Sequence, residues 1–298
     1  LVGRILIRLG AQGAGWRGFA AFIARRALRT LPLYVLWLAV LLAVFPPRQD
    51  VLAVGLRLLT LTQNFLAPMP ADYYFAVSWS LTIECWFYLL FGAAYLVAAH
   101  AQNSVRATRW CLAGFLLAPL IARLLYGDKP ALVPFRLDDL IYGVLFAKLA
   151  ARNSRLLDYP RACFIAGLAV VTMLGADLLI PALHSNTLVA GCALCLPAAV
   201  RINHLAQWLA VPVRWIASRS YALYLIHLTI LADVVEINFW QTGLLPVPAC
   251  IAVAMLLPCL LAELSYRLLE RPLLRLHEAS GFTSRYHPPA GAISGTAP

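Results

Sequence analysis

Long apolar runs separated by short loops occupy almost the whole of this 298-residue chain. Hydrophobic residues make up 62% of it and charged residues only 12%, which is about half the charged share of a soluble domain. A helix that crosses a bilayer needs about 20 mostly apolar residues and satisfies its backbone hydrogen bonds internally. The chain is therefore predicted to be an all-α, polytopic transmembrane helix bundle.

About eight of the runs are read as membrane spans. They cover residues 30–45, 75–98, 110–125, 134–149, 162–180, 187–200, 220–239 and 247–269. Residues 51–66 are also apolar, but Arg57 and Asn64 interrupt them, so a short re-entrant or surface helix is expected there. Residues 1–276 are predicted to form one transmembrane domain, and the Gly-, Pro- and Ser-containing residues 277–298 a disordered tail.

Basic residues are concentrated in alternate loops and give the chain a formal net charge of +11. The loops near 100–109, 148–161, 201–219 and 271–286 are basic, whereas those near 46–50, 127–130, 181–186 and 240–246 are not. With about eight spans, every basic loop lies on one side, which the positive-inside rule assigns to the cytoplasm together with residues 1–29 and the carboxyl terminus. The pattern indicates contact with anionic lipid and no binding of nucleic acid.

The seven cysteines lie in apolar stretches, and their odd number argues against a disulfide framework. Cys192 and Cys195 have the spacing of a redox or metal pair, but no second pair accompanies them. We expect them to pack inside a helix, and no metal site is predicted.

One predicted span, 75–98, carries a polar stripe. Ser80, Glu84 and Tyr88 are four residues apart, so their oxygens lie along one face of a helix. An ionised carboxylate in hydrocarbon is costly, which means that Glu84 either has a partner or faces a water-filled cavity.

Three further groups of polar residues occur in or beside predicted spans. Arg136 stands near Asp138 and Asp139 at the start of the span 134–149, where it could pair with either aspartate or with Glu84. The alternatives are a structural ion pair that locks two helices and a charge cluster that binds substrate.

Ser220, Tyr224 and His227 share one helical face at the start of the span 220–239. A histidine there is either a hydrogen-bonding contact between helices or a functional group. Arg26 and Arg29 lie three residues apart before the first span, where they either set topology or bind a phosphate-rich ligand through bidentate contacts.

Five stretches, in order, resemble the acyltransferase 3 family of membrane proteins, which acylate sugars and other acceptors. Residues 79–88, WSLTIECWFY, match the family's WSLxxExxFY pattern almost completely. The other four are RALR (26–29) for its RxxR, RLDDLIYG (136–143) for its RxDxLxxG, SYALYLIH (220–227) for its SYxLYLxH and ERP (270–272) for its ExP.

The resemblance implies a ten-helix bundle in the bacterial inner membrane. It would move an acyl group, usually acetyl, from cytoplasmic acyl-CoA to a hydroxyl of a carbohydrate or other envelope acceptor, with acyl-CoA as co-substrate and no bound cofactor. The residues that match the family's motifs would then be donor-binding (Arg26, Arg29), supporting groups in catalysis (Glu84, His227) and cavity-lining (Ser80, Tyr88, Arg136, Asp138, Tyr224).

The resemblance also has a gap at the amino terminus. Residues 1–7 resemble only the end of the family's second helix. The first helix, with an arginine and the histidine regarded as the catalytic base, and most of the second helix are therefore expected to be missing from this chain. Two alternatives to an acyltransferase therefore stay open, a non-catalytic remnant and a transporter or flippase of an acylated or glycosylated substrate. A transporter is expected to show inverted repeats and helices broken at the midplane, and neither is evident in the sequence.

Overall fold

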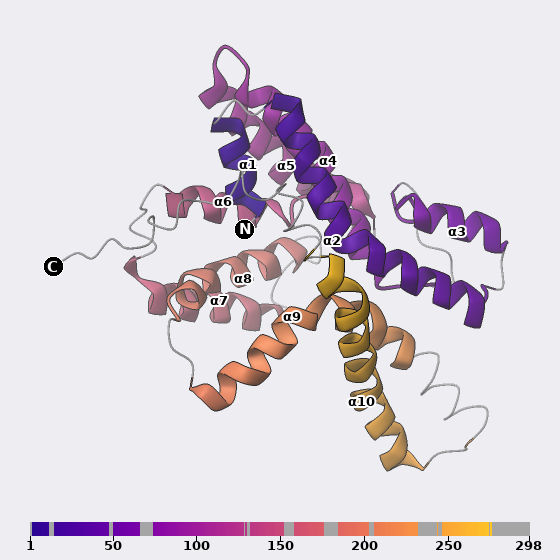
Figure 1. The fold of residues 1–298 in the computed structure, drawn as a ribbon. Helices are drawn as coiled ribbons and strands as arrows, with labels where there is room; N and C mark the ends of the chain where they lie inside the picture. The colour runs from indigo at the N-terminus through magenta and orange to yellow at the C-terminus, as the bar shows by residue number, and fades with distance from the viewer. Residues whose placement is uncertain are drawn as a thin grey trace. The chain divides into compact units, whose positions relative to one another are not determined.

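The computed structural model describes residues 2–11, 15–47, 50–65, 74–127, 129, 132–151, 158–175, 184–202, 206–231, 243, 246–273 and 275. Over these residues the regular structure is entirely helical and contains no strand (Figure 1). The prediction of an all-α helix bundle is confirmed. The predicted tail, 277–298, lies outside the described residues.

Every predicted span overlaps a helix, and the short helix expected within 51–66 is α3. The helices are α1 (Val2–Ala11), α2 (Gly15–Val44), α3 (Val51–Leu59), α4 (Ser78–Ala99), α5 (Ser104–Tyr126), α6 (Ile141–Ala151), α7 (Pro160–Gly175), α8 (His184–Val200), α9 (Gln207–Thr229) and α10 (Val247–Ser265). A 3-10 turn, η1 (Val133–Phe135), precedes α6, and a π-helical turn, η6 (Tyr266–Glu270), continues α10.

Two helices begin well before the predicted spans. Helix α2 has 30 residues and starts at Gly15, so Arg26 and Arg29 lie inside a helix and Pro32, predicted near its start, is internal. Helix α9 starts at Gln207, so Arg219, predicted in a loop, is helical. Hydropathy alone placed both starts too late, because basic residues end an apolar run without ending a helix.

Two other boundaries also differ from the prediction. Residues 134–140 were predicted to be part of a span, but they form η1 and turns, and the helix begins only at Ile141. A loop was predicted near 181–186, but residues 184–186 are the first turn of α8.

Four helices in the described part of the chain are long and apolar enough to cross a membrane. They are Gly15–Val44, Ser78–Ala99, Ser104–Tyr126 and α10 with its continuation, Val247–Leu273. Helices α7 and α8 are apolar but shorter, and the 11 residues of α6 extend only about 16 Å, roughly half the hydrocarbon thickness. The chain is thus a membrane helix bundle, while the number of eight spans stays a prediction.

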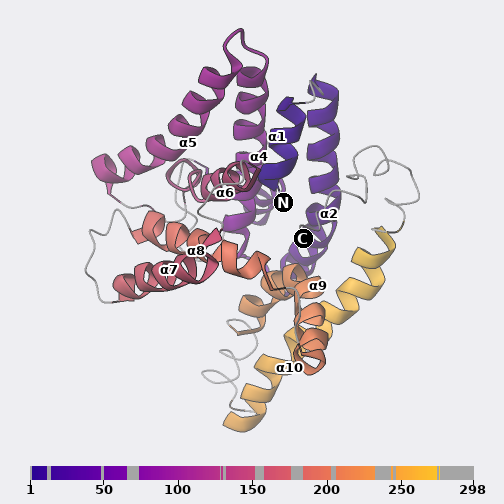
Figure 2. The same ribbon diagram turned by 90° about the vertical axis from the view of Figure 1, so that its left-hand side faces the viewer.

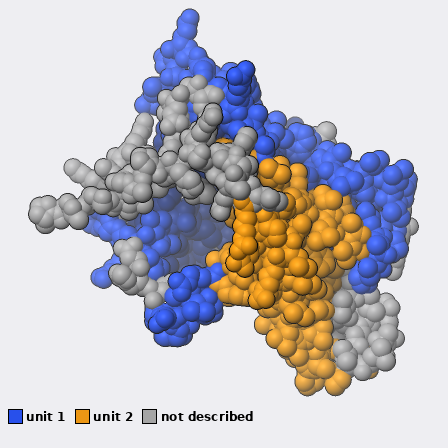
Figure 3. All heavy atoms as spheres, viewed as in Figure 1, with its two compact units in different colours: residues 1–24, 41–214 blue, residues 25–40, 215–298 orange. Residues whose placement is uncertain are grey.

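The chain divides into two compact units, which Figure 3 shows in different colours. Unit 1 comprises Leu1–Ala24 and Leu41–Arg214, and unit 2 comprises Arg25–Val40 and Trp215–Pro298.

Helix α4 lies at the centre of unit 1. In its most apolar 18-residue segment, 50% is buried, whereas in the corresponding segment of α5 only 22% is buried. Its aromatic residues form the core: Phe87 and Phe91 stack with ring centroids 4.9 Å apart, and Phe115 of α5 meets Phe91 edge-on at 5.2 Å. Leu6 and Leu9 of α1 and Ile141 and Val144 of α6 are buried in the same cluster.

Helices α7 and α8 lie side by side in unit 1 in both views (Figures 1 and 2). Two glycines allow their backbones to approach closely. A Cβ on Gly167 would lie 2.6 Å from the Gly191 carbonyl oxygen, and a Cβ on Gly191 would lie 2.8 Å from Val171. Small residues of this kind are typical of helix contacts in membranes.

Unit 2 combines the middle of α2 with α9 and α10. The Tyr221 hydroxyl on α9 donates a hydrogen bond to the Thr30 carbonyl oxygen on α2 over 2.9 Å. Arg219 on α9 and Glu263 on α10 form an ion pair at 2.5 Å. These polar contacts join three segments that are far apart in the sequence.

Candidate functional site

The predicted polar stripe of α4 is partly formed as expected. The Tyr88 hydroxyl donates a hydrogen bond to Glu84 Oε1, one turn earlier on the helix. The Ser80 hydroxyl donates to the Val77 carbonyl oxygen at 3.4 Å. Glu84 and Ser80 are half-buried, whereas Tyr88 is 5% exposed. The carboxylate therefore has a partner on its own helix.

A second polar face of α4 was not predicted. Gln63 Nε2 donates to the hydroxyls of Ser78 at 3.0 Å and Thr82 at 2.6 Å, and all three residues are buried. Trp86 Nε1 donates to the Leu61 carbonyl oxygen at 2.7 Å. These bonds hold the segment after α3 against α4. The four-residue spacing of Ser78 and Thr82 is the signal that could have revealed this face.

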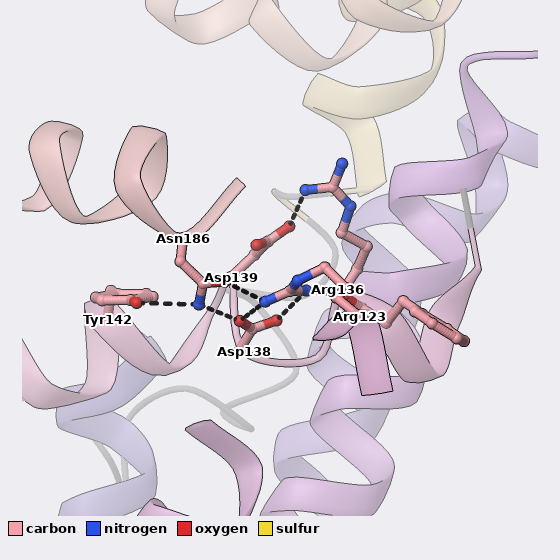
Figure 4. A network of polar contacts seen from close by, with 7 residues as sticks. Arg123, Arg136, Asp138, Asp139, Tyr142 and Asn186 are labelled. Carbon is pink, nitrogen blue, oxygen red and sulfur yellow. Dashed lines mark hydrogen bonds and ion pairs between the residues drawn. The ribbon is translucent and has the colours of Figure 1, made fainter. Parts of the chain in front are cut away.

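Two fully buried charges of unit 1 form an ion pair between α5 and the turn before α6 (Figure 4). Arg123 and Asp138 are both 0% exposed, with Nη2 and Oδ2 2.5 Å apart and Nη1 and Oδ1 3.2 Å apart. Arg123 also donates to the Phe135 carbonyl oxygen. This bidentate geometry is the strong form of an arginine–carboxylate contact.

Asn186 of α8 completes this network. Its Nδ2 donates to Asp138 Oδ2 at 2.5 Å and to the Tyr142 hydroxyl at 3.2 Å, and its Oδ1 accepts a hydrogen bond from Arg123. We call Arg123, Asp138, Tyr142 and Asn186 the α5–α6–α8 network. Its bonds favour the structural alternative for Asp138, a lock between helices.

Arg136, which was expected to pair with an aspartate or with Glu84, lies 3.8 Å from Asp139. Asp138 pairs instead with Arg123, a residue that the sequence analysis did not select. Arg123 lies inside the predicted span 110–125, and an arginine within an apolar span was the signal for it. Asn186 was missed because a loop was predicted at its position, whereas it lies in α8.

In unit 2, the Glu263 carboxylate on α10 links this helix to α9 through hydrogen bonds. It accepts hydrogen bonds from Trp215 Nε1 at 2.8 Å, Arg219 Nε at 2.5 Å and Arg267 Nε at 2.5 Å. The Arg219 guanidinium also lies 4.3 Å from the ring centroid of Tyr266, within cation–π range. The sequence analysis named neither Glu263 nor its partners as site residues.

His227 and Tyr224 lie on the same face of α9, as their spacing predicted, with ring centroids 5.9 Å apart. His227 Nδ1 is 2.8 Å from the Tyr224 carbonyl oxygen and 3.1 Å from that of Leu223. A carbonyl oxygen only accepts, so Nδ1 carries the proton and Nε2 keeps the lone pair when the ring is neutral.

A cavity of about 320 Å³ within unit 2 contains one of the predicted donor-binding arginines. Its lining residues come from α2, α9, the π-helical turn η6 and the helical residues that follow it: Arg25, Leu28, Arg29, Pro32, Leu33, Ala217, Ser218, Tyr266, Leu269, Glu270 and Leu273. We call it the Arg25–Arg29 cavity. Arg25 and Arg29 are one turn apart on α2, so their side chains leave the helix on the same side.

Glu270, from the ERP segment, lines the same cavity. Its Oε1 is buried and has no hydrogen-bond partner among the described residues, and Arg29 is close enough to act on the carboxylate electrostatically. The structure thus brings together two of the five motifs, RALR and ERP. Arg26, by contrast, is not among the lining residues.

The other predicted site residues are divided between the units. Ser80, Glu84, Tyr88, Arg136 and Asp138 belong to unit 1, whereas Arg26, Arg29, Tyr224 and His227 belong to unit 2. The single cavity that all of them were expected to share stays a prediction. The described residues thus form a membrane helix bundle that contains a buried polar network in unit 1 and a cavity lined by Arg25 and Arg29 in unit 2.

The family follows from comparison with known proteins. A model of the acyltransferase 3 family, described as an acyltransferase domain, matches residues 2–263. The chain belongs to this family.

The chain is 29% identical over 227 residues to the peptidoglycan O-acetyltransferase OatA of Listeria monocytogenes serovar 1/2a (strain ATCC BAA-679 / EGD-e). The match covers 65% of this chain and 34% of the relative, so the chain spans about a third of that protein. No solved structure matches the chain significantly.

Proposed function

We propose that the chain is the membrane part of an O-acyltransferase that moves an acyl group, in the first instance acetyl, from acyl-CoA to a carbohydrate hydroxyl. The family match over residues 2–263 supports the class of reaction. The similarity to a protein named as a peptidoglycan O-acetyltransferase supports a glycan acceptor and acetyl transfer. The alternating basic loops support a cytoplasmic carboxyl terminus, and the resemblance to the family supports a bacterial inner-membrane location.

The observation that carries the proposal is the Arg25–Arg29 cavity, in which the RALR and ERP segments meet. Coenzyme A carries several phosphate groups, and guanidinium groups bind phosphate through bidentate, charge-assisted hydrogen bonds. Arg29, with Arg25 one turn away, would bind these phosphates. Arg26, whose side chain is half-buried and lies on the same helix, would add to the positive field at the mouth of this site.

The remaining groups of the cavity suit the rest of a nucleotide. Tyr266 offers an aromatic surface, and the Glu270 carboxylate offers an acceptor for a hydroxyl or amino group. An unpartnered carboxylate oxygen beside two arginines would also reject an anion that has no donor group to offer it. We therefore place the adenosine end of acyl-CoA, rather than a simple phosphate, in this cavity.

The transfer itself needs a general base for the acceptor hydroxyl. The hydroxyl oxygen attacks the thioester carbonyl carbon, its proton passes to the base, the carbon–sulfur bond breaks, and coenzyme A leaves as a thiol after protonation. The resemblance assigns the base to a histidine of the family's first helix. Glu84, held by Tyr88, and His227, through its free Nε2, would orient the acceptor or the base by hydrogen bonding.

Binding of labelled acetyl-CoA to the purified full chain tests the donor site. Arg29→Gln removes a charged hydrogen-bond donor worth about 1.5–3 kcal/mol, so Kd should rise about 10- to 100-fold. Arg17→Gln is the matched control, because Arg17 is exposed on the same helix and does not line the cavity. Equal Kd values for the Arg29→Gln variant, the Arg17→Gln variant and the unchanged protein would refute the site.

Transfer is tested with the full gene product and labelled acetyl-CoA. The label should appear on an envelope glycan, and Glu84→Gln should lower the transfer rate while the protein still inserts and folds. Donor binding without label on any glycan would favour a remnant. A substrate carried across vesicles without new ester bonds would instead favour a transporter.

A further inference from the structure

A groove lies within unit 1 between α5 and α6, and the residues that line it have no role in the proposed acyl transfer. It encloses about 340 Å³, within the range of small-ligand pockets. Its lining residues are Arg109, Leu112, Ala113, Leu116, Leu145, Lys148 and Leu149. We call it the α5–α6 groove; none of these residues lines the Arg25–Arg29 cavity.

The groove has a basic end and an apolar body. Both cations line the same groove: Arg109 lies near the start of α5 and Lys148 near the end of α6. Leu112, Ala113 and Leu116 follow Arg109 along one face of α5 over about 10 Å of helix. No acidic residue is among the lining residues.

The residues around the basic end indicate a position at the level of lipid headgroups. Trp110, next to Arg109, is 67% exposed, and tryptophan is enriched where a membrane meets water. Val105 and Leu117 of α5 are 58% and 47% exposed and so present further apolar surface. Loops at this end of both helices are also among the basic loops of the chain.

We propose that the α5–α6 groove binds an anionic phospholipid, with an acyl chain against the leucines and the phosphate at Arg109 and Lys148. Basic pockets between membrane helices on the cytoplasmic side suit such headgroups. A soluble phosphate would leave the apolar body in contact with water, and a zwitterionic lipid would place its own cation beside Arg109 and Lys148. Charge and apolar surface together therefore select an anionic lipid.

Native mass spectrometry of the full chain in detergent, titrated with phosphatidylglycerol, measures this site directly. Two cations contribute about 1 kcal/mol each near an anionic headgroup, so Arg109→Gln with Lys148→Gln should weaken the first bound lipid about 30-fold. Arg106→Gln is the matched control: Arg106 is exposed on the first turn of α5 and does not line the groove. Arg109→Lys with Lys148→Arg should keep the affinity.

Further binding measurements distinguish an anionic phospholipid from other ligands of the groove. Phosphatidylcholine should bind at least ten-fold more weakly than phosphatidylglycerol, and glycerol phosphate and acetyl-CoA should not displace the lipid. Ala113→Phe, which fills the body without changing charge, should weaken phosphatidylglycerol binding in a protein whose melting temperature is unchanged. Equal affinity in the double Gln variant and the Arg106→Gln variant, or displacement by glycerol phosphate, overturns the proposal.

Discussion

Unit 1 and unit 2 both hold arginine and carboxylate side chains among apolar helices, but they use them differently. In unit 1, Arg123 and Asp138 are 0% exposed and are bonded to each other and to Asn186. In unit 2, Arg29 is exposed and lines a cavity of about 320 Å³ opposite a carboxylate oxygen that has no hydrogen-bond partner among the described residues.

The difference separates a structural role from a binding role. A buried ion pair is tolerated only when its desolvation is offset by good geometry and further hydrogen bonds, and the α5–α6–α8 network has both. In this network the charged groups bond to one another and to Asn186, and one buried atom, Arg123 Nε, has no hydrogen-bond partner among the described residues. The Arg25–Arg29 cavity keeps charged groups beside open space, which is what a binding site for a charged ligand requires. Substitutions in the α5–α6–α8 network or in the Arg25–Arg29 cavity test the two roles separately.

The largest effect is expected from Asp138→Ala. It leaves the Arg123 guanidinium buried without a counter-charge, which costs about 3–5 kcal/mol of unfolding free energy. Unfolding in detergent, followed by circular dichroism, measures the loss. The double variant Arg123→Met with Asp138→Leu should recover much of it, because no uncompensated charge remains. A loss below about 1 kcal/mol for Asp138→Ala would mean that the pair is not sealed.

Asn186→Ala should lower the free energy of unfolding by less than Asp138→Ala does. It keeps the ion pair but removes one hydrogen-bond partner from each charge, an effect of about 1–3 kcal/mol. The same unfolding measurement applies, with Gln102→Ala as the control, because Gln102 is an exposed polar residue in the turn before α5. A cost as small as the control's would show that water replaces the amide and that the network is open.

Arg136→Gln should have a small effect. Its contact with Asp139 is 3.8 Å long, and the side chains are 14% and 24% exposed. Partly exposed pairs of this kind contribute up to about 1 kcal/mol. If Arg136→Gln destabilises the protein as much as Asp138→Ala does, Arg136 is also a member of the α5–α6–α8 network.

Arg29→Gln should have the smallest effect on stability, within about 0.5 kcal/mol, because the side chain is exposed. The substitution is expected to weaken the binding of the acetyl-CoA donor instead. Thermal unfolding with and without acetyl-CoA distinguishes the two, since a ligand that binds only the folded state raises the melting temperature. A destabilised apo protein would assign Arg29 to the fold rather than to the cavity.

The sequence predicted the residues of these sites better than it predicted their partners. Glu84 and Tyr88 were placed on one face by spacing alone and are hydrogen bonded, because a helix fixes which residues four apart are neighbours. Asp138 was selected, but its partner Arg123 was not, since the two come together through the packing of α5 against the turn before α6. Arg29 was selected as a donor-binding residue, Glu270 was matched only as part of the ERP motif, and nothing in the sequence placed the two in one cavity.

The sequence by itself determined that this protein is a helical membrane protein and, through five ordered motifs, which family it belongs to. Composition, helical periodicity and motif spacing are local properties, so one chain is enough to read them. Only the tertiary structure decided which charges are sealed and which line a cavity. That outcome depends on contacts between helices far apart in the chain, as between Arg123 and Asn186, which are 63 residues apart.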